Sequence, residues 1–324
     1  MQKTLVSIVI PIYNVEKTIK KCLDSIQKQT YQNIEILCID DCSPDKSASI
    51  VMHLQKSDPR IKYFTYKKNR GSGGARDFGI RHAKGSYIIF VDADDFIDPI
   101  FIEQYMRESK NGFDIIAGGY IHESPKHTRR HMPSSAQESP WIDPSPCTKA
   151  FKLSFLKEHN IDFRNVRYYE DVIFNYRCLS NNPKLKIINY CGYHYVMNNE
   201  SNTRSGNPER KYATYAKSHY DFFIEDTWKR LDQEQKDCLE YAFYQHLTIG
   251  MLVNIHHAGT KAAHNIFSTW KTCIDRTFPN YLDNRYVKSG GPNCEQPHIK
   301  RTLKVFNFSQ KIKLTHLLTW ILSK

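Results

Sequence analysis

The stretch that decides the fold is Tyr87-Ile88-Ile89-Phe90-Val91-Asp92-Ala93-Asp94-Asp95, an apolar run that ends in three carboxylates. The apolar part is typical of a buried strand, and open α/β sheets bind their ligands at the carboxyl ends of strands. Because like charges this close repel each other, a divalent cation that bridges carboxylates to phosphates would offset the repulsion. The stretch therefore predicts a metal–diphosphate site. The alternative is an acidic turn before a helix that begins at Asp98-Pro99.

Strand patterns and helix patterns alternate on both sides of this stretch. The expected strands cover residues 5–10, 33–39, 61–66, 87–91 and 113–119, and the expected helices cover residues 15–29, 45–55, 74–83 and 98–109. Near-continuous apolar strands that alternate with helices are typical of a mostly parallel sheet with helices on both faces. The sequence therefore predicts an α/β fold.

The later part of the chain has a different pattern. Residues 121–146 are rich in His, Ser and Pro and predict a long loop, and residues 147–196 predict a helix, a strand, a helix and two short strands. Helices are then expected over 209–228, 232–257 and 261–273. We therefore predict a domain over residues 1–205, a helical extension over 206–280 and a basic amphipathic tail over 281–324.

Composition excludes several classes of protein. With 40% hydrophobic and 25% charged residues, the chain of 324 residues is globular rather than disordered. Its apolar runs are too short to span a bilayer, and its first residues lead into a strand without the pattern of a signal peptide. Nine cysteines without a Cys-x-x-Cys pair are typical of reduced cytosolic thiols rather than of a disulfide framework or a zinc site. We therefore expect a cytoplasmic protein.

Polar residues follow three of the expected strands. They are Tyr13-Asn14 after the first strand, Asp40-Asp41 after the second, and the carboxylates of the opening stretch after the fourth. In a parallel sheet these strand ends lie on one edge, so the residues can converge on one ligand.

The glycine-rich segment at residues 69–77 (NRGSGGARD) lies between these strand ends in the sequence. Its glycines could leave backbone amides open to a phosphate at a helix start, with Arg76 as an added charge. A plain turn with a helix cap is the alternative. Arg76 occupies the third glycine position of the dinucleotide-binding fingerprint, so the segment does not match that fingerprint.

Four spaced signatures occur in order over about residues 4–205. They are SIVIPIYN at 7–14, SI at 25–26 with QTYQNIE at 29–35, IDD at 39–41 and DADD at 92–95. As a set they resemble the family 2 glycosyltransferases of GT-A fold. The resemblance implies a hexosyltransferase that moves a sugar from a nucleotide sugar with inversion at the anomeric carbon, usually with a divalent metal. It also implies a GT-A sheet followed here by a helical C-terminal region.

Carried over position by position, the resemblance implies a nucleotide site. Pro11, Tyr13, Asn14 and Asp41 would hold the nucleotide. Asp41 would accept a hydrogen bond from the uracil N–H, which favours a UDP-sugar as the donor. Arg76 would lie near the nucleotide or its diphosphate.

The same resemblance implies the metal site. Asp92 would hold the ribose, and Asp94 would bind the Mn²⁺ or Mg²⁺ that bridges the two phosphates, with Asp92 as a further candidate ligand. Asp77 departs from the Asn that relatives often carry. It would either add a carboxylate near the phosphates or point outward.

Inverting transfer needs a general base opposite the leaving group. The segment YEDVIF at residues 169–174 resembles the acidic pair that precedes a helix in the family. Asp171 is the predicted base, and Glu170 is the second candidate. The alternative is a pair of acids that stabilises a helix N-terminus through the helix dipole.

Further residues are candidates for the acceptor side or for a flap: Asp95, Lys149, His194 and Arg204, the last within a flap predicted at 201–205. For Lys149 the alternative is a solvated lysine, and for His194 it is a packed or hydrogen-bonded residue. Trp141 could stack on a sugar or pack in the core.

The basic tail indicates where in the cell the protein acts. Residues 281–324 hold 8 Lys/Arg and 2 Asp/Glu, a balance of +6 out of a net charge of +12. Leu314, Leu317, Leu318 and Ile321 recur at helical spacing beside Trp320, as in an interfacial helix on an anionic leaflet. A terminal helix docked on the body is the alternative. We expect a peripheral enzyme on the inner face of the plasma membrane, with a homodimer as an open possibility.

These observations favour an enzyme that builds a surface polysaccharide. The expected acceptor is a lipid-linked oligosaccharide, a lipopolysaccharide or a capsule precursor. A nucleotidyltransferase that makes nucleotide sugars would need a basic glycine-rich loop after the first strand, and PIYN at 11–14 is no such loop. A basic nucleic-acid-binding protein would leave the Asp clusters unexplained, because carboxylates repel phosphate, and no nucleic-acid partner is expected.

Overall fold

The chain forms two compact units in a computed structural model. The model describes residues 4–125, 127–132, 134, 136, 139–164, 166, 169–197, 207–256, 258–312, 314–315 and 322–323. The sheet unit comprises Met1–Ser135, Pro144–Cys178 and Asn182–Asn199, and the helical unit comprises Ala136–Asp143, Leu179–Asn181 and Glu200–Lys324. The parts predicted over 206–280 and 281–324 therefore fall together in the helical unit.

The sheet unit begins with four parallel strands in the order β3-β2-β1-β4. They are β1 (Val6–Ile12), β2 (Ile34–Asp40), β3 (Ile61–Thr65) and β4 (Tyr87–Phe90). The strands β1, β2 and β4 are almost wholly buried, which explains their near-continuous apolar sequences. The predicted strands in this part are confirmed within one or two residues.

The sheet continues with strands of mixed direction, so the mostly parallel sheet that the sequence predicts is parallel in its first half and mixed beyond β4. Beyond β4 the order is β8 (Lys149–Lys152), β6 (Ile115–Glu123), β9 (Leu185–Val196) and β5 (Phe96–Ile97), while β7 (Thr128–His131) pairs with β6. The strand β8 is antiparallel to both β4 and β6, whereas β6 and β9 are parallel.

The structure differs from the sequence-based expectation between residues 121 and 196. The strand β9 is continuous over twelve residues, where two short strands were expected. The predicted loop contains the end of β6, the strand β7 and the short helix α5 (Ser139–Ile142). The sequence of β7, Thr-Arg-Arg-His, has no apolar alternation because its side chains are largely exposed, so pairing with β6 rather than burial defines this strand.

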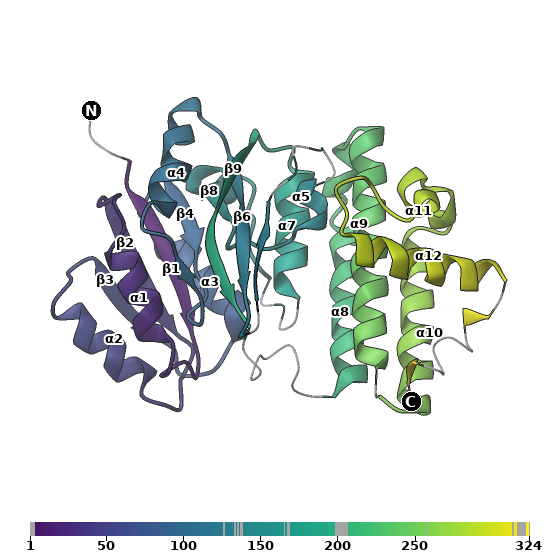
Figure 1. The fold of residues 1–324 in the computed structure, drawn as a ribbon, viewed down its shortest axis with the longest axis horizontal. Helices are drawn as coiled ribbons and strands as arrows, with labels where there is room; N and C mark the ends of the chain where they lie inside the picture. The colour runs from purple at the N-terminus through teal and green to yellow at the C-terminus, as the bar shows by residue number, and fades with distance from the viewer. Residues whose placement is uncertain are drawn as a thin grey trace. The chain divides into compact units, whose positions relative to one another are not determined.

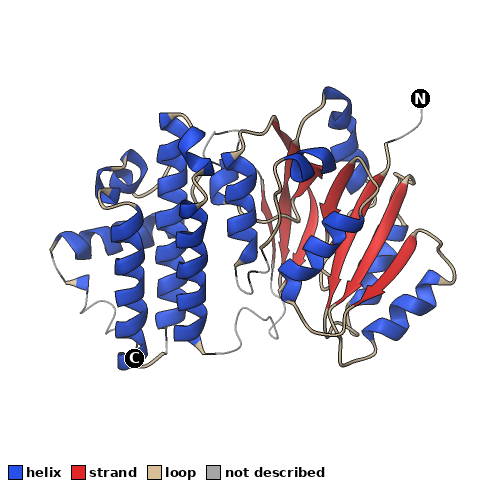
Figure 2. Ribbon diagram, turned by 180° about the vertical axis from the view of Figure 1, so that it is seen from behind, coloured by secondary structure: helices blue, strands red, loops and turns tan. Residues whose placement is uncertain are grey.

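Helices cover both faces of the sheet (Figures 1 and 2). They are α1 (Ile19–Gln27), α2 (Ser47–Gln55), α3 (Gly71–His82), α4 (Phe101–Glu108), α6 (Leu153–Glu158) and α7 (Glu170–Ser180), with a 3₁₀ turn η1 at Ser109–Asn111. Right-handed crossovers place α1 and α2 on one face and α3 on the other, because the chain reverses its direction across the sheet after β3. The helix α4 begins at Phe101, three residues after the Asp98 start that the sequence predicts.

The helical unit is built around three long helices that pack side by side (Figure 1). These are α8 (Pro208–Ile224), α9 (Gln233–Ile255) and α10 (Thr260–Thr277), followed by η4 (Tyr281–Asp283), α11 (Arg285–Ser289) and α12 (Pro297–Lys311), with a 3₁₀ turn η3 at Thr227–Arg230. Asp232 and Gln235 form a capping box that starts α9. Among the described residues, no helix has both the length and the apolar character needed to cross a membrane.

Candidate active site

Three polar segments lie at one edge of the sheet, as the sequence predicts. The strands β2 and β4 are the two parallel neighbours of β1, so the segments that follow all three leave from the same edge. The Asp41 amide donates to the carbonyl of Ile12 (2.8 Å), which ties the end of β2 to the end of β1. Tyr13 is exposed here, and Asn14 adopts a positive φ of 55°.

Asp41 holds the start of α3. Its two carboxylate oxygens accept from the amides of Arg70 and Gly71, each at 2.7 Å. Burial raises the pKa of Asp41, although these two amides act against that rise. The helix therefore begins at Gly71 rather than at the expected Gly74, and its first amides are already engaged by a carboxylate. The expectation that the glycine amides stand open to a phosphate is therefore wrong for Gly71.

Arg76 connects two parts of the site. This buried guanidinium donates from Nη2 to Oδ1 of Asp92 (2.7 Å) and from Nη1 to Oε1 of Glu170 (2.9 Å). Glu170 also accepts a hydrogen bond from the Ser72 hydroxyl. Arg76 of α3 therefore joins the carboxylate cluster after β4 to the acidic pair at the start of α7, and Ser72 of the same helix adds a second bond to that pair.

Gly73 makes this junction possible. A Cβ atom at this position would lie 3.2 Å from Cγ of Glu170 and 3.2 Å from the carbonyl oxygen of Val166. The helix α3 thus approaches the start of α7 closely enough for Ser72 and Arg76 to reach Glu170. Gly73 therefore has a packing role, which the prediction of a phosphate cradle did not include.

The cluster after β4 is anchored to β9. The Tyr193 hydroxyl donates to Asp95 (2.6 Å) and accepts from the Asp92 amide (3.2 Å), and the Val196 amide donates to Asp95 (2.8 Å). Burial, followed by the charges of Asp92 and Asp94, raises the pKa of Asp95 well above its usual range. Burial and the charge of Asp92 also raise the pKa of Asp94, to about 6.

These carboxylates suit a divalent metal that shares its coordination with phosphates. Asp92 and Asp94 are crowded oxygen donors whose mutual repulsion a cation would relieve. Within the described part of the chain, no three His, Cys, Asp or Glu side chains gather closely enough to hold a metal by themselves. Mg²⁺ commonly binds through one or two carboxylates and completes its shell with waters and substrate phosphates. The residues present therefore fit such a metal.

The acidic pair at the start of α7 divides into two different environments. Glu170 is held by Arg76 and Ser72, whereas the Asp171 carboxylate accepts a hydrogen bond from the Val172 amide (2.9 Å). Burial and the neighbouring charge of Glu170 raise the pKa of Asp171, against the opposing effect of Arg76. An ionised carboxylate with a raised pKa is a stronger base than an ordinary aspartate, which supports Asp171 as a proton acceptor.

Lys149 and His194 are engaged inside the fold. Lys149 is buried on β8, and its Nζ donates to the carbonyl of Ser145 (2.7 Å). His194 lies between two carboxylates, with Nδ1 2.8 Å from Glu123 and Nε2 3.0 Å from Asp98, and it stacks on Phe96 with ring centroids 4.2 Å apart. The Glu123 pKa is lowered chiefly by its hydrogen bond with His194.

Other residues singled out in the sequence lie in the core or beyond the described residues. Asp77 is buried and accepts from the Phe163 amide (2.6 Å), so its side chain does not point outward. Trp141 is buried in the helical unit. Arg204 and the predicted flap at 201–205 lie outside the described residues.

Sequence reasoning missed Ser72 and Tyr193. Their partners, Glu170 and Asp95, lie 98 residues away along the chain in each case, so no local pattern marks them. The only available signal for Ser72 was its position four residues before Arg76 on the same helix face.

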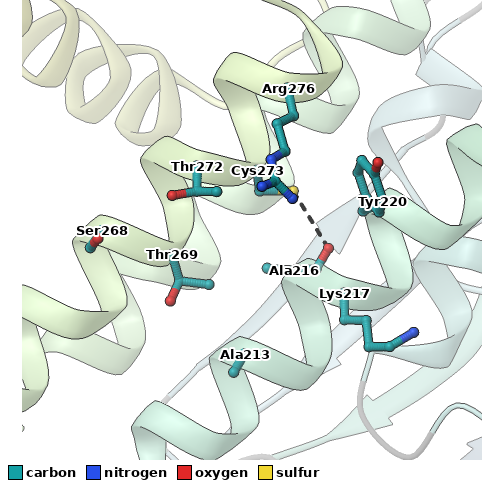
Figure 3. Close-up of a pocket in the computed structure, with 9 residues that line it drawn as sticks. All are labelled: Ala213, Ala216, Lys217, Tyr220, Ser268, Thr269, Thr272, Cys273 and Arg276. Carbon is teal, nitrogen blue, oxygen red and sulfur yellow. Dashed lines mark hydrogen bonds between the residues drawn. The ribbon is translucent and has the colours of Figure 1, made fainter.

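The helical unit has an open groove of about 320 Å³ between α8 and α10 (Figure 3). Small and hydroxyl side chains line it, with Lys217, Tyr220 and Arg276 at its rim, and the Cys273 thiol contacts the Ala216 carbonyl at 3.5 Å. None of the residues predicted for the active site lines this groove.

Comparisons with known proteins agree with this geometry. The model of the family "Glycosyl transferase family 2" matches residues 7–176. The uncharacterized glycosyltransferase EpsJ of Bacillus subtilis is 30% identical over 61% of this chain and 63% of its own length. The minor teichoic acid biosynthesis protein GgaB of the same organism is 25% identical over 87% of this chain and 33% of its own length. The chain thus matches less than two thirds of either relative.

A solved structure shares the fold. It is that of residues 1–349 of S. aureus TarS in complex with UDP-GlcNAc, which covers 96% of this chain and 89% of the TarS chain with a TM-score of 0.76 at 18% identity. The family match spans the strand ends, the glycine-rich helix α3 and the acidic start of α7, which are the elements that meet at Arg76. The chain therefore has a GT-A fold and belongs to glycosyl transferase family 2.

Proposed function

We propose that this glycosyltransferase is an inverting, metal-dependent enzyme that moves a hexose or N-acetylhexosamine from a UDP-sugar to a hydroxyl group of a glycan acceptor. The observation that carries the proposal is the bridge through Arg76, which joins Asp92 of the carboxylate cluster to Glu170 beside Asp171. The carboxylate cluster and the residue next to the proposed base are thereby held by one buried guanidinium, which suits a reaction that must position two bound substrates.

On the donor side, Pro11, Tyr13, Asn14 and Asp41 would bind the nucleotide. Each Asp41 oxygen keeps a second lone pair beside the one used by the start of α3, so a uracil N–H can still be accepted. The TarS structure with UDP-GlcNAc supports a UDP-sugar donor.

Asp94 and Asp92 would hold Mn²⁺ or Mg²⁺ together with the diphosphate of the donor. A bound metal of this kind acts as a Lewis acid that stabilises the charge on the departing UDP. A mannosyltransferase of Pyrobaculum calidifontis, which shares the fold at a TM-score of 0.58, was solved with GDP-Man and Mn²⁺ and supports a metal.

Asp171 would act as the general base. Its carboxylate accepts the proton of the acceptor hydroxyl while the hydroxyl oxygen bonds to the anomeric carbon, and the bond from that carbon to the UDP oxygen breaks with its electron pair leaving on UDP. Attack from the face opposite UDP inverts the anomeric configuration. Asp95 lies beside this cluster, whereas Lys149 and His194 would reach an acceptor only after exchanging the partners that hold them.

We propose an acceptor of the surface-polysaccharide class that is presented at the inner face of the plasma membrane, such as a lipid-linked oligosaccharide, a lipopolysaccharide or a capsule precursor. The teichoic acid protein GgaB supports a surface-polymer acceptor, and the excess of basic residues in the C-terminal part of the chain supports a site at an anionic surface.

The test is release of UDP from a panel of UDP-sugars, with Mn²⁺ and then with EDTA, by the wild type and by Asp94→Ala. We expect metal-dependent release from one sugar that Asp94→Ala abolishes and that Asp24→Ala, a change on the surface of α1, leaves intact. If release persists in EDTA and in Asp94→Ala, the metal-dependent mechanism is wrong. If no UDP-sugar reacts and CDP or dTDP binds more tightly than UDP, the UDP donor is wrong.

A second variant tests the base. We expect Asp171→Asn to bind UDP like the wild type and to lose transfer by roughly 100-fold or more, because the amide cannot accept the hydroxyl proton. Transfer at the wild-type rate would remove Asp171 from this role.

A further inference from the structure

The helix α12 uses one of its faces to pack on the helical unit. Phe306 contacts Trp270 of α10 edge to face, with ring centroids 5.1 Å apart. Asn307 accepts from the Tyr244 hydroxyl of α9 and donates to the Val287 carbonyl of α11 (3.0 Å). Leu303, Phe306 and Asn307 are buried and stand at positions i, i+3 and i+4, so this face of α12 packs against the helical unit.

The opposite face of α12 is exposed and apolar. Val305, Phe308 and Ile312 recur at i, i+3 and i+7, so they form one stripe along the helix and its C-cap. Phe308 is 62% exposed and Val305 is 54% exposed, and Leu314 just beyond the helix is also exposed. Large apolar side chains gathered in this way on a surface helix usually mark an interaction site.

Basic residues accompany the stripe. Arg301, Lys304 and Lys311 are exposed on the same outward half of α12, and residues 298–324 contain no Asp or Glu. Of the tail stripe that the sequence predicts, only Leu314 falls within the described residues. The outward face of α12 therefore combines apolar and basic side chains as the predicted tail stripe does, but on residues that the structure describes.

We propose that the outward face of α12, with the stripe Val305, Phe308 and Ile312 and the charges of Arg301, Lys304 and Lys311, is a docking surface for an anionic lipid bilayer. The apolar side chains would enter the boundary between headgroups and acyl chains, while the lysine and arginine heads stay at the level of the phosphates. A protein partner with an acidic surface would pair with the charges alone, whereas a bilayer also takes up exposed apolar side chains such as Phe308. This inference rests on the membrane-borne acceptor of the proposed function and deepens it, because it names the residues that bind the membrane rather than the sugar that is transferred.

The test is sedimentation of the full chain with unilamellar vesicles of phosphatidylcholine, with or without phosphatidylglycerol. We expect binding to the phosphatidylglycerol vesicles that weakens with added salt. The variant Phe308→Ser/Lys311→Glu should bind at least about ten-fold more weakly, because it removes one apolar anchor and reverses one charge. Both side chains are exposed, so the variant should keep the wild-type circular dichroism and melting curve.

The matched control is Met52→Ser/Lys56→Glu, which makes the same kind of change at an exposed position of α2 in the sheet unit. It should bind vesicles like the wild type. The proposal is wrong if the wild type stays in the supernatant with phosphatidylglycerol vesicles, or if Phe308→Ser/Lys311→Glu binds as tightly as the wild type. It is also wrong if that variant turns a dimer into a monomer in sedimentation velocity without lipid, since the face would then bind a second copy. Vesicle binding needs no sugar donor, so its failure would leave the transfer reaction standing.

Discussion

At the scale of single residues, the site depends on the shared guanidinium of Arg76. Its two partners, Asp92 and Glu170, are 16 and 94 residues away along the chain. A buried arginine between two carboxylates balances charges that burial would otherwise destabilise. The planar fork of arginine suits this task because separate nitrogens reach the two partners, whereas a lysine offers a single point charge.

This geometry predicts that Arg76→Lys lowers kcat by about ten-fold or more and has a smaller effect on KM for the donor. The lysine keeps the charge, but it cannot hold Asp92 and Glu170 in place at the same time. The measurement is the steady-state kinetics of transfer from the preferred UDP-sugar. The control is Arg81→Lys, the same substitution at an exposed position of α3. Equal kinetics for the two variants would show that the bridge does not position the site.

The environment of Asp171 predicts a pH dependence. A general base must be ionised, so activity falls as the pH drops below its pKa. Because burial and Glu170 raise that pKa, kcat/KM should show an acidic limb at least one pH unit above the ordinary aspartate value of about 3.9. Arg76 opposes the rise, so Arg76→Lys, which displaces the charge, should move the limb to higher pH. A limb at the ordinary aspartate value in both enzymes would contradict the assignment.

Single residues also show the limits of sequence reasoning. Asp92, Asp94 and Asp41 can be found from the sequence because each directly follows an apolar strand, and parallel strands bring such ends to one edge. The contacts of Asp41 with the start of α3 and of Tyr193 with Asp95 cannot be found in this way. They depend on how two distant segments meet, and no periodicity within either segment encodes that distance.

At the scale of elements, buried strands and amphipathic helices follow their sequence patterns, whereas exposed elements do not. The strands β1, β2 and β4 carry near-continuous apolar runs because both faces are covered. In contrast, β7 and the bulged pairing of β6 with β9 are defined by cross-strand hydrogen bonds, which leave little trace in hydrophobicity. The direction of β8, which makes the sheet mixed, likewise depends on the path of the chain after β7.

The close contact of α3 with β1 predicts a strong effect of a single methyl group. A Cβ at Gly79 would overlap the methyl groups of Val9, which is fully buried in β1. We expect Gly79→Ala to lower the free energy of unfolding by about 1–3 kcal/mol through overpacking. In Gly79→Ala/Val9→Ala the loss should be smaller than the sum of the two single losses, because the second change makes room for the first. Urea unfolding of the four proteins measures this coupling, and additivity within about 0.5 kcal/mol would falsify the steric explanation.

At the scale of the whole molecule, the two units differ in their buried titratable groups. In the helical unit, burial lowers the pKa of His219 to about 3 and that of His246 to about 4. His219 lies against the rings of Tyr215 and Phe243 and bonds to the Tyr215 carbonyl, and the neighbouring His246 lowers its pKa further. In the sheet unit, Asp171 has a raised pKa instead.

These shifts have opposite consequences for stability. In the unfolded chain a histidine has a pKa of about 6.5. Between that pH and the lower pKa of the folded state, the unfolded chain therefore binds a proton that the folded chain does not. The helical unit should therefore lose about 1.4 kcal/mol per histidine for each pH unit below about 6.5. A carboxyl with a raised folded pKa acts in the other direction, since the folded state takes up the proton first as the pH falls. Burial also raises the pKa of Glu240 and Glu295 in the helical unit, so these two carboxyls oppose the loss that the histidines cause. Between pH 7 and pH 5, where carboxyls of ordinary pKa stay ionised, we expect the histidines to weaken the helical unit before the sheet unit.

The positions of the tryptophans allow this difference to be measured. Trp141, Trp228 and Trp270 lie in the helical unit, and the segments of the sheet unit contain no tryptophan, so tryptophan fluorescence follows the helical unit. We expect the urea midpoint by fluorescence to fall between pH 7 and pH 5 by more than the midpoint by circular dichroism, which follows both units.

His219→Phe, which fills the same aromatic cluster without a titratable ring, should remove about half of that fall, while His298→Gln at the exposed start of α12 should not. If the fluorescence midpoint does not move with pH, or if His219→Phe behaves like the wild type, the buried histidines do not set the acid stability of this unit.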